Sequence, residues 1–240
     1  MPVSNENIQL LSDKYPWPQN QPEVDPVEWV LDGGGKKLVF NRIQKDNPFL
    51  IVEIGSFLGS SLKQWLEYSP NVYVIAIDPW EGEWWAEYAQ KHGRENLVKQ
   101  LSEDNGPYMT FLSSQWKYRD RIFPVRGMSP EKLYEIADLG IQPDLVYFDS
   151  DKVGGDIEIA HTLFPNAILT GDDWTWGVGE GYPIRKTAKS FAKKYGYKIV
   201  ADRATWALKK PTLSLQEKIN NLMSFVRDII RGLKQIVLSK

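Results

Sequence analysis

Three aspartates, Asp149, Asp172 and Asp173, stand just after short apolar segments of the sequence. The segments Asp144–Phe148 and Ala167–Thr170 are nearly continuously apolar, as strands of a parallel sheet covered on both faces are. Neighbouring strand ends would bring the three carboxylates together, where they repel one another unless a cation is present or some are protonated. Hard oxygen ligands suit Mg²⁺, or less often Ca²⁺ or Mn²⁺. The pattern therefore predicts a Mg²⁺ site, with ordinary helix-capping or solvated acids as the alternative.

A second candidate site is the segment Ile51–Ser61, IVEIGSFLGSS, in which a buried strand runs into a glycine turn and a helix. Gly55 can take the backbone angles of a tight turn and lets a ligand come close. The helix is predicted to start near Ser60 and Ser61, whose hydroxyls and free backbone N–H groups can hold a carboxylate. The spacing differs from G-x-G-x-x-G, so it disfavours dinucleotide binding. Taken alone, the segment is also compatible with an ordinary loop of any α/β protein.

The next apolar segment, Val74–Ile77, ends in Asp78, about twenty residues after the glycine turn. In an open parallel sheet, ligands bind at the carboxyl ends of the strands where the strand order reverses. An acid at the end of the second strand can accept hydrogen bonds from both hydroxyls of a ribose. Asp78 alone can also be a turn or cap residue before Pro79. The glycine turn followed by the strand-end acid favours a ribose-containing ligand.

In this order the motifs EIGSFLGSS and IAIDP resemble the class I S-adenosylmethionine-dependent methyltransferases. The closest likeness is to divalent-metal-dependent small-molecule O-methyltransferases of the catechol and macrocin type, and it covers residues 47 to 210 approximately. The resemblance implies cofactor-binding roles for Glu53, Gly55, Ser56 and Ser61 toward the methionine half, Asp78 toward the ribose, and Met128 and Ser129 toward the adenine. For Ser129, capping of the helix that begins at Pro130 is an alternative.

The same resemblance places metal ligands at Asp149, Asp172 and Asp173, and catalytic roles at Lys152 and Asp149. Lys152 has the spacing of the catechol-type base, whereas Asp173 stands where the catechol type has an amide and matches the macrocin type. This implies Mg²⁺-dependent O-methylation of a small molecule with vicinal hydroxyls, a sugar or an aromatic natural product. The alternatives are a metal-independent methyltransferase with Asp149 or Lys152 as base, a non-catalytic methyltransferase-like module, and a nucleotide-binding oxidoreductase.

These site residues need a fold that gathers strand ends at one edge of a sheet. Apolar segments alternate with amphipathic ones from about residue 47 to 210, and the last two, Tyr197–Val200 and Thr205–Leu208, are close enough for an antiparallel hairpin. We predict a Rossmann-like α/β fold: a seven-stranded, mostly parallel sheet with a C-terminal antiparallel hairpin and helices on both faces. The predicted parts are an N-terminal extension (1–46), the methyltransferase domain (47–210) and a C-terminal amphipathic helix (211–240).

Composition narrows the function classes further. The chain of 240 residues has no cysteine, which excludes a disulfide framework and thiolate chemistry, and its net charge of −2 gives no footprint for nucleic acid. No apolar run approaches the ~20 residues of a membrane span, and the first residues lack the pattern of a signal peptide. We therefore expect a cytoplasmic enzyme with a small-molecule acceptor, no nucleic acid or integral membrane partner, and a homodimer through the C-terminal helix as an option.

The tryptophans near the predicted strand ends have two interpretations, whereas the two histidines have one. Five tryptophans follow two of the predicted strand ends, where they can line an aromatic or sugar-binding pocket or pack in the core: Trp80, Trp84, Trp85, Trp174 and Trp176. His92 and His161 have no second histidine at a useful spacing, so both are expected to be structural or surface residues.

Overall fold

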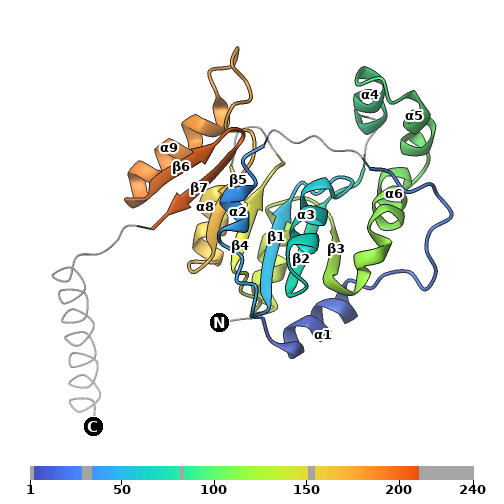
Figure 1. Ribbon diagram of the computed structural model, residues 1–240, viewed down its shortest axis with the longest axis horizontal. Helices are drawn as coiled ribbons and strands as arrows, with labels where there is room; N and C mark the ends of the chain where they lie inside the picture. Colours follow the sequence, from blue (N-terminus) through green and yellow to red (C-terminus); the bar gives the residue numbers. More distant parts are fainter. Residues whose placement is uncertain (1–2, 29–33, 82–83, 151–154, 211–240) are drawn as a thin grey trace, which may run out of the picture. The chain divides into compact units, whose positions relative to one another are not determined.

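The computed structural model describes residues 3–28, 34–81, 84–150 and 155–210. In these residues seven strands form one sheet in the order β3-β2-β1-β4-β5-β7-β6 (Figure 1). β7 runs antiparallel to both of its neighbours, and the other pairs are parallel. The predicted mostly parallel sheet with a terminal antiparallel pair is confirmed. The strands are β1 (Phe49–Ile54), β2 (Val72–Asp78), β3 (Ile122–Arg126), β4 (Leu145–Phe148), β5 (Ile168–Gly171), β6 (Lys198–Asp202) and β7 (Thr205–Lys209).

Helices cover both faces of the sheet, as predicted. One face packs against residues of α1, α7, α8 and α9, and the other against residues of α2 to α6. The helices are α1 (Asn5–Lys14), α2 (Lys37–Phe40), α3 (Ser60–Tyr68), α4 (Trp84–Lys91), α5 (Glu95–Ser102), α6 (Gly106–Gln115), α7 (Glu131–Asp138), α8 (Asp156–Leu163) and α9 (Pro183–Tyr195), with a 3₁₀ helix at Trp116–Arg121.

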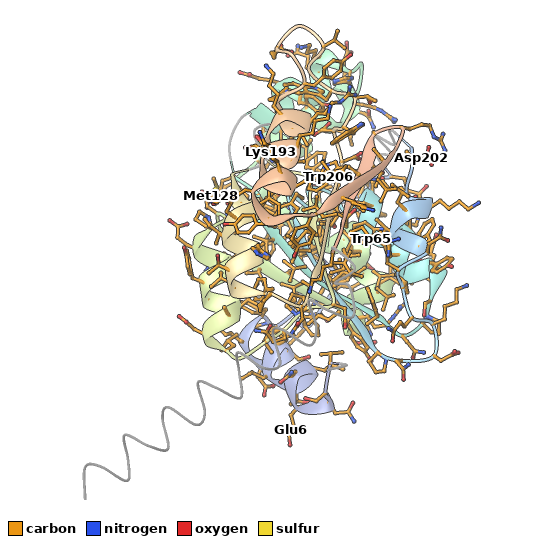
Figure 2. All side chains as sticks on the ribbon, turned by 90° about the vertical axis from the view of Figure 1, so that its left-hand side faces the viewer. Glu6, Trp65, Met128, Lys193, Asp202 and Trp206 are labelled. Atoms are coloured by element: carbon orange, nitrogen blue, oxygen red, sulfur yellow. The ribbon has the colours of Figure 1, made fainter. Side chains whose placement is uncertain are left out.

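The burial of the central strand β1 on both faces explains why its segment of the sequence is almost continuously apolar. Every residue of β1 is buried. Leu50 and Val52 belong to the hydrophobic core on one face, whereas Ile51 belongs to the core on the other, because successive side chains of a strand point to opposite faces. Figure 2 shows the indole rings of Trp65 and Trp206 in the interior of the molecule. Two separate cores therefore hold the helices on the sheet.

The order of the strands reverses between β1 and β4. The chain goes from β1 outward to β2 and β3, and then returns to place β4 on the other side of β1. Such a reversal leaves a crevice at the carboxyl ends of the two strands, which is the usual ligand site of an open parallel sheet. The fold thus predicts where the functional site lies before any site residue is considered.

The N-terminal segment packs closely on the sheet domain. Leu11 of α1 is buried in one core and Val39 of α2 in the other. The indole Nε1 of Trp17 donates a hydrogen bond to the carbonyl oxygen of Ile122, at 2.7 Å. Residues 3–28 and 34–46 are therefore part of the same compact unit as the strands. The predicted amphipathic helix at 211–240 and the predicted base Lys152 lie outside the described residues.

None of the helices in the described residues combines the length and the apolar character that crossing a membrane requires.

Candidate functional site

A cavity of about 1080 Å³ opens at the carboxyl ends of the parallel strands. Its volume matches the upper end of the range for small-molecule sites, roughly 300–1,000 Å³. Residues at or just after the ends of β1 to β5 line it, so the strand reversal does form a ligand-sized space. The predicted site residues that line it are Gly55, Ser56, Ser61, Asp78, Met128, Ser129, Asp149, Asp172 and Asp173.

The glycine turn after β1 depends on the absence of a side chain. Gly55 has φ +87°, and a Cβ atom there would collide with the backbone carbonyl of Asp149 at the end of β4. Gly59, at φ +81°, is the N-cap of α3, so the helix starts at Ser60 as predicted. The turn therefore brings the ends of β1 and β4 into contact and points the start of α3 at the cavity.

Glu53 lies behind the cavity wall. Its side chain is completely buried, and its carboxylate accepts hydrogen bonds from the hydroxyl groups of Ser61 and, at 3.3 Å, of Ser56. Burial raises the pKa of the Glu53 carboxyl to about 7, although the hydrogen bonds oppose this. The two serines line the cavity whereas Glu53 does not. Glu53 thus positions Ser56 and Ser61, and the sequence did not foresee this indirect role.

Asp78 ties the ends of β1 and β2 together. One oxygen of its carboxylate accepts a hydrogen bond from the backbone N–H of Phe57 at 3.0 Å, and the other accepts from Trp80 at 2.7 Å. The side chain is 3% exposed, and this burial raises the pKa of its carboxyl to about 6. Each carboxylate oxygen can accept a second hydrogen bond. Asp78 can therefore bind a ligand hydroxyl while it fixes the turn.

The loop after β3 contains a buried polar atom with no partner. The hydroxyl oxygen of Ser129 is buried, and the described residues offer it no hydrogen bond. Helix α7 begins at Glu131 without a side-chain cap, so the alternative of Ser129 as a helix cap is wrong. Met128 beside it is 58% exposed at the cavity. Because buried polar groups normally have partners, the Ser129 hydroxyl is a candidate ligand contact.

Some of the tryptophans pack in the core and others line the cavity. Trp80 is completely buried in the core, where its indole N–H donates to the carbonyl of Phe57 at 2.6 Å. Trp85 of α4 lines the cavity and stacks on Phe57, with ring centroids 3.4 Å apart and planes 7° from parallel. Trp176 also lines the cavity. His161 packs among the rings of α9 and the residue Tyr197, which agrees with its predicted structural role.

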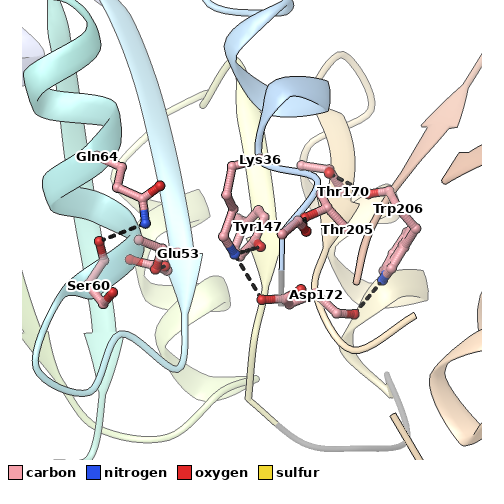
Figure 3. A network of polar contacts seen from close by, with 11 residues as sticks. Lys36, Glu53, Ser60, Gln64, Tyr147, Thr170, Asp172, Thr205 and Trp206 are labelled. Carbon is pink, nitrogen blue, oxygen red and sulfur yellow. Dashed lines mark hydrogen bonds and ion pairs between the residues drawn. The ribbon is translucent and has the colours of Figure 1, made fainter. Parts of the chain in front are cut away.

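The three predicted metal ligands share the far end of the cavity, after β4 and β5. Asp172 is 7% exposed, and its Oδ2 forms an ion pair with the ammonium group of Lys36 at 2.8 Å (Figure 3). Its Oδ1 is buried without a hydrogen-bond partner among the described residues. Asp149 and Asp173 line the same space. Within the described ranges, no three histidine, aspartate or glutamate side chains are grouped so that they can hold a metal ion.

Sequence reasoning missed Lys36, because the N-terminal extension carried no motif. The residue before it, Gly35, has φ +91°, and a Cβ atom there would collide with the carbonyl of Asp202 in β6. The hydroxyl group of Thr205 donates to the carbonyl of Gly34 at 2.9 Å. The glycine run therefore lets the chain pass tightly against the β6–β7 hairpin and brings Lys36 to the cavity wall. A lysine directly after a glycine run was the available signal.

Comparison with known proteins finds similarity to solved structures. No known protein family and no curated protein matches the sequence. Human methyltransferase-like protein 13 in complex with SAH has 12% identity and a TM-score of 0.48, and the match covers 80% of this chain and 90% of that chain. The C-terminal domain of precorrin-6Y C5,15-methyltransferase from Rhodobacter capsulatus has 12% identity and a TM-score of 0.47, with 78% and 94% covered. The O-methyltransferase from Bacillus cereus in complex with SAH has 18% identity and a TM-score of 0.44, with 88% and 93% covered.

At these identities the similarity concerns the fold alone. The order β3-β2-β1-β4-β5-β7-β6, with β7 antiparallel to its neighbours, agrees with the arrangement that the sequence motifs led us to expect. The strand order and the antiparallel last strand pair show a Rossmann-like α/β fold.

Proposed function

We propose that this protein is an S-adenosylmethionine-dependent methyltransferase that methylates an oxygen of a small molecule. The observation that carries the proposal is one continuous cavity with two different ends. Serines, glycines and Asp78 line one end, after β1 to β3, and we assign it to the cofactor. Asp149, Asp172 and Lys36 line the other end, after β4 and β5, and we assign it to the acceptor.

The cofactor end offers a partner for each part of S-adenosylmethionine. The N-terminus of α3, with Ser60 and Ser61, suits the carboxylate of the methionine half because free backbone N–H groups and the helix dipole attract an anion. Asp78 suits the ribose hydroxyls, since its oxygens retain acceptor capacity. The unpartnered hydroxyl of Ser129 suits a polar atom of the adenine. When bound, the cofactor supplies an electrophilic methyl group on its sulfonium.

The acceptor end supports an oxygen nucleophile. Methyl transfer needs a nucleophile held in line with the methyl group, so the residues of this end must hold the acceptor oxygen in place. The carboxylates can accept a hydrogen bond from a hydroxyl group, and the ammonium group can donate one to its oxygen. The rings of Trp85, Tyr88 and Trp176 line the same cavity and give apolar surface to an acceptor of sugar or aromatic type.

A divalent metal can take part only if the three predicted ligands are arranged to bind it. One oxygen of Asp172 already pairs with Lys36, and the described residues do not form a metal-holding group. These observations support the metal-independent alternative, in which Asp149 at the cavity wall is the candidate base. The predicted Mg²⁺ requirement is tested directly by turnover in the presence of a chelator.

Calorimetric titration with S-adenosylhomocysteine tests the cofactor assignment. We expect saturable binding of one molecule per chain and no binding of NAD⁺. Absence of S-adenosylhomocysteine binding would remove the proposed function, and NAD⁺ binding would favour the oxidoreductase instead.

Transfer of labelled methyl groups to a panel of phenols, catechols and sugars then tests catalysis. We expect product in the presence of EDTA and the same rate with added Mg²⁺. Cofactor binding without transfer to any acceptor would favour a non-catalytic methyltransferase-like module.

The cytoplasmic location and the homodimer through residues 211–240 are proposals that rest on the sequence. Truncation after Pro211 tests the second one: we expect a smaller assembly in light scattering and unchanged affinity for S-adenosylhomocysteine.

A further inference from the structure

The acceptor end of the cavity contains a cation that belongs to the chain itself. We infer that the Lys36 ammonium group, and not a divalent metal ion, neutralises the carboxylates at this end. The term acceptor end rests on the proposed function, but the inference about the cation concerns binding and can be tested without an acceptor.

Lys36 is held by two partners on neighbouring strands. Its Nζ donates to Asp172 Oδ2 after β5 at 2.8 Å and to the phenol oxygen of Tyr147 in β4, and it lies 4.7 Å from the centre of the Tyr147 ring. The side chains of Lys36 and Asp172 are only 6% and 8% exposed. A buried ammonium group persists only with such compensation, so the pair is an internal charge pair of the fold.

The backbone around Lys36 fixes its position. Gly34 accepts the hydroxyl hydrogen bond of Thr205, Gly35 packs on β6, and the backbone N–H groups of Leu38 and Val39 donate to Gly35 and Lys36 at 2.9 Å each. The neighbouring Lys37 is exposed. Two consecutive lysines therefore have opposite environments, which gives a matched control for any experiment on Lys36.

A second cation at this place would be repelled. A divalent ion on Asp172 would lie a few ångströms from the Lys36 ammonium, where low exposure leaves little screening by water. One carboxylate oxygen of Asp172 is also already bonded to Lys36. The ion pair thus competes with metal binding both electrostatically and for a ligand atom.

The ammonium group retains a function toward a ligand. It has three N–H groups, and two of them have partners among the described residues. Because Lys36 lines the cavity, the third can donate to an acceptor oxygen. Such an acceptor needs a single oxygen at this point, and it does not need the neighbouring pair that chelation of a metal would require.

Titration of Mn²⁺, followed by its electron paramagnetic resonance signal, tests the inference on the full chain saturated with S-adenosylhomocysteine. The wild type is expected to leave Mn²⁺ free. Lys36→Met removes the charge at similar length and should raise the affinity for Mn²⁺ at least ~10-fold, whereas Lys36→Arg and Lys37→Met should behave as the wild type.

Two results would overturn the inference. One is a wild-type chain that binds one Mn²⁺ and loses it in Asp172→Asn, since the metal would then coexist with Lys36. The other is a Lys36→Met chain that binds Mn²⁺ no better than the wild type. If Lys36→Met fails to fold, the comparison of wild type with Asp172→Asn still decides. Failure of the proposed function is distinguished separately, by absence of S-adenosylhomocysteine binding in the wild type.

Discussion

The two ends of the cavity differ in how far apart in the sequence their contacting residues lie. At the cofactor end, Glu53 bonds to Ser61 eight residues further on, and Asp78 bonds to Phe57 across 21 positions. At the acceptor end, Lys36 reaches Tyr147 and Asp172 across 111 and 136 positions. A local pattern of residues determines the first end, whereas only the folded topology assembles the second.

The two ends also stabilise buried charge differently. Glu53 and Asp78 accept hydrogen bonds from hydroxyl and backbone N–H donors, and the positive charge of Lys36 also lowers the pKa of Glu53. Burial outweighs these effects and raises the pKa of the two carboxyls to about 7 and about 6. Asp172 instead has a full cation beside it. The cofactor end therefore contains two carboxyls that gain a proton nearer to neutral pH than ordinary carboxyls do, whereas the acceptor end depends on one ion pair. The experiments below test this contrast, in order of expected effect.

Removal of the cation should have the largest effect on stability. Lys36→Met leaves the carboxylate of Asp172 buried without its partner, and such a change typically destabilises by about 3–5 kcal/mol. Lys37→Met, at an exposed position, should stay within about 0.5 kcal/mol of the wild type. Urea unfolding measures both. Asp172→Asn added to Lys36→Met should recover part of the loss, and equal stability of the two lysine variants would contradict the ion pair.

The contact between the two ends is tested at the glycine turn. Gly55→Ala forces a side chain into a left-handed residue and against the carbonyl of Asp149, so we expect a loss of roughly 2–4 kcal/mol from strain and overpacking. Gly93 also has positive φ, at +67°, but a Cβ atom there meets nothing within 4 Å. Gly93→Ala should therefore cost only about 1 kcal/mol, by the backbone effect alone. Similar losses in thermal unfolding for both variants would mean that the β1–β4 contact is not tight.

The same contrast between local and long-range contacts decides which parts of the fold and of the site the sequence could predict. The segments predicted for β2, β4, β5, β6 and β7 agree with the strands to within about two residues, because apolar runs and turn residues are local features. The placement of Gly55, Ser61 and Asp78 around one cavity followed from the order of motifs along a parallel sheet, and that of Ser129 from the family resemblance. For these residues, chain order translates directly into position at the strand ends.

The acceptor end could not be predicted in that way. Asp149, Asp172 and Asp173 were correctly brought to one region, but which cation faces them depends on a residue from the other end of the chain. Nothing periodic marks Lys36, and its position follows from the packing of Gly35 against β6. The role of Glu53 behind the serines also needed the burial of its side chain to be known.

The buried acid Glu53 should make stability depend on pH. Its pKa is about 7 in the folded chain against a usual 4.5, so the folded state binds the proton more tightly than the unfolded state does. The free energy of unfolding should therefore fall as pH rises from about 4.5 to about 7, by up to ~3 kcal/mol from this group. Glu53→Gln should remove that part of the slope in urea unfolding at several pH values. Glu131→Gln, at an exposed position, is the control, and an unchanged slope in Glu53→Gln would contradict the assignment.

The smallest effect should come from Asp78, because its change leaves most of the cofactor end intact. Asn at this position keeps one oxygen to accept a backbone N–H but loses the charge that strengthens a hydrogen bond to a ribose hydroxyl, a contribution of roughly 1.5–3 kcal/mol. We expect Asp78→Asn to weaken binding of S-adenosylhomocysteine by about one to two decades in calorimetry. In the wild type, affinity should also fall as pH drops through about 6, because the carboxylate then gains a proton, and this dependence should be absent in the variant. Asp144→Asn is the matched control, since Asp144 accepts the backbone N–H of Leu50 at 2.8 Å just before β4, at the other end of the strands. If both variants bind S-adenosylhomocysteine as the wild type does, Asp78 only fixes the turn and the ribose lies elsewhere.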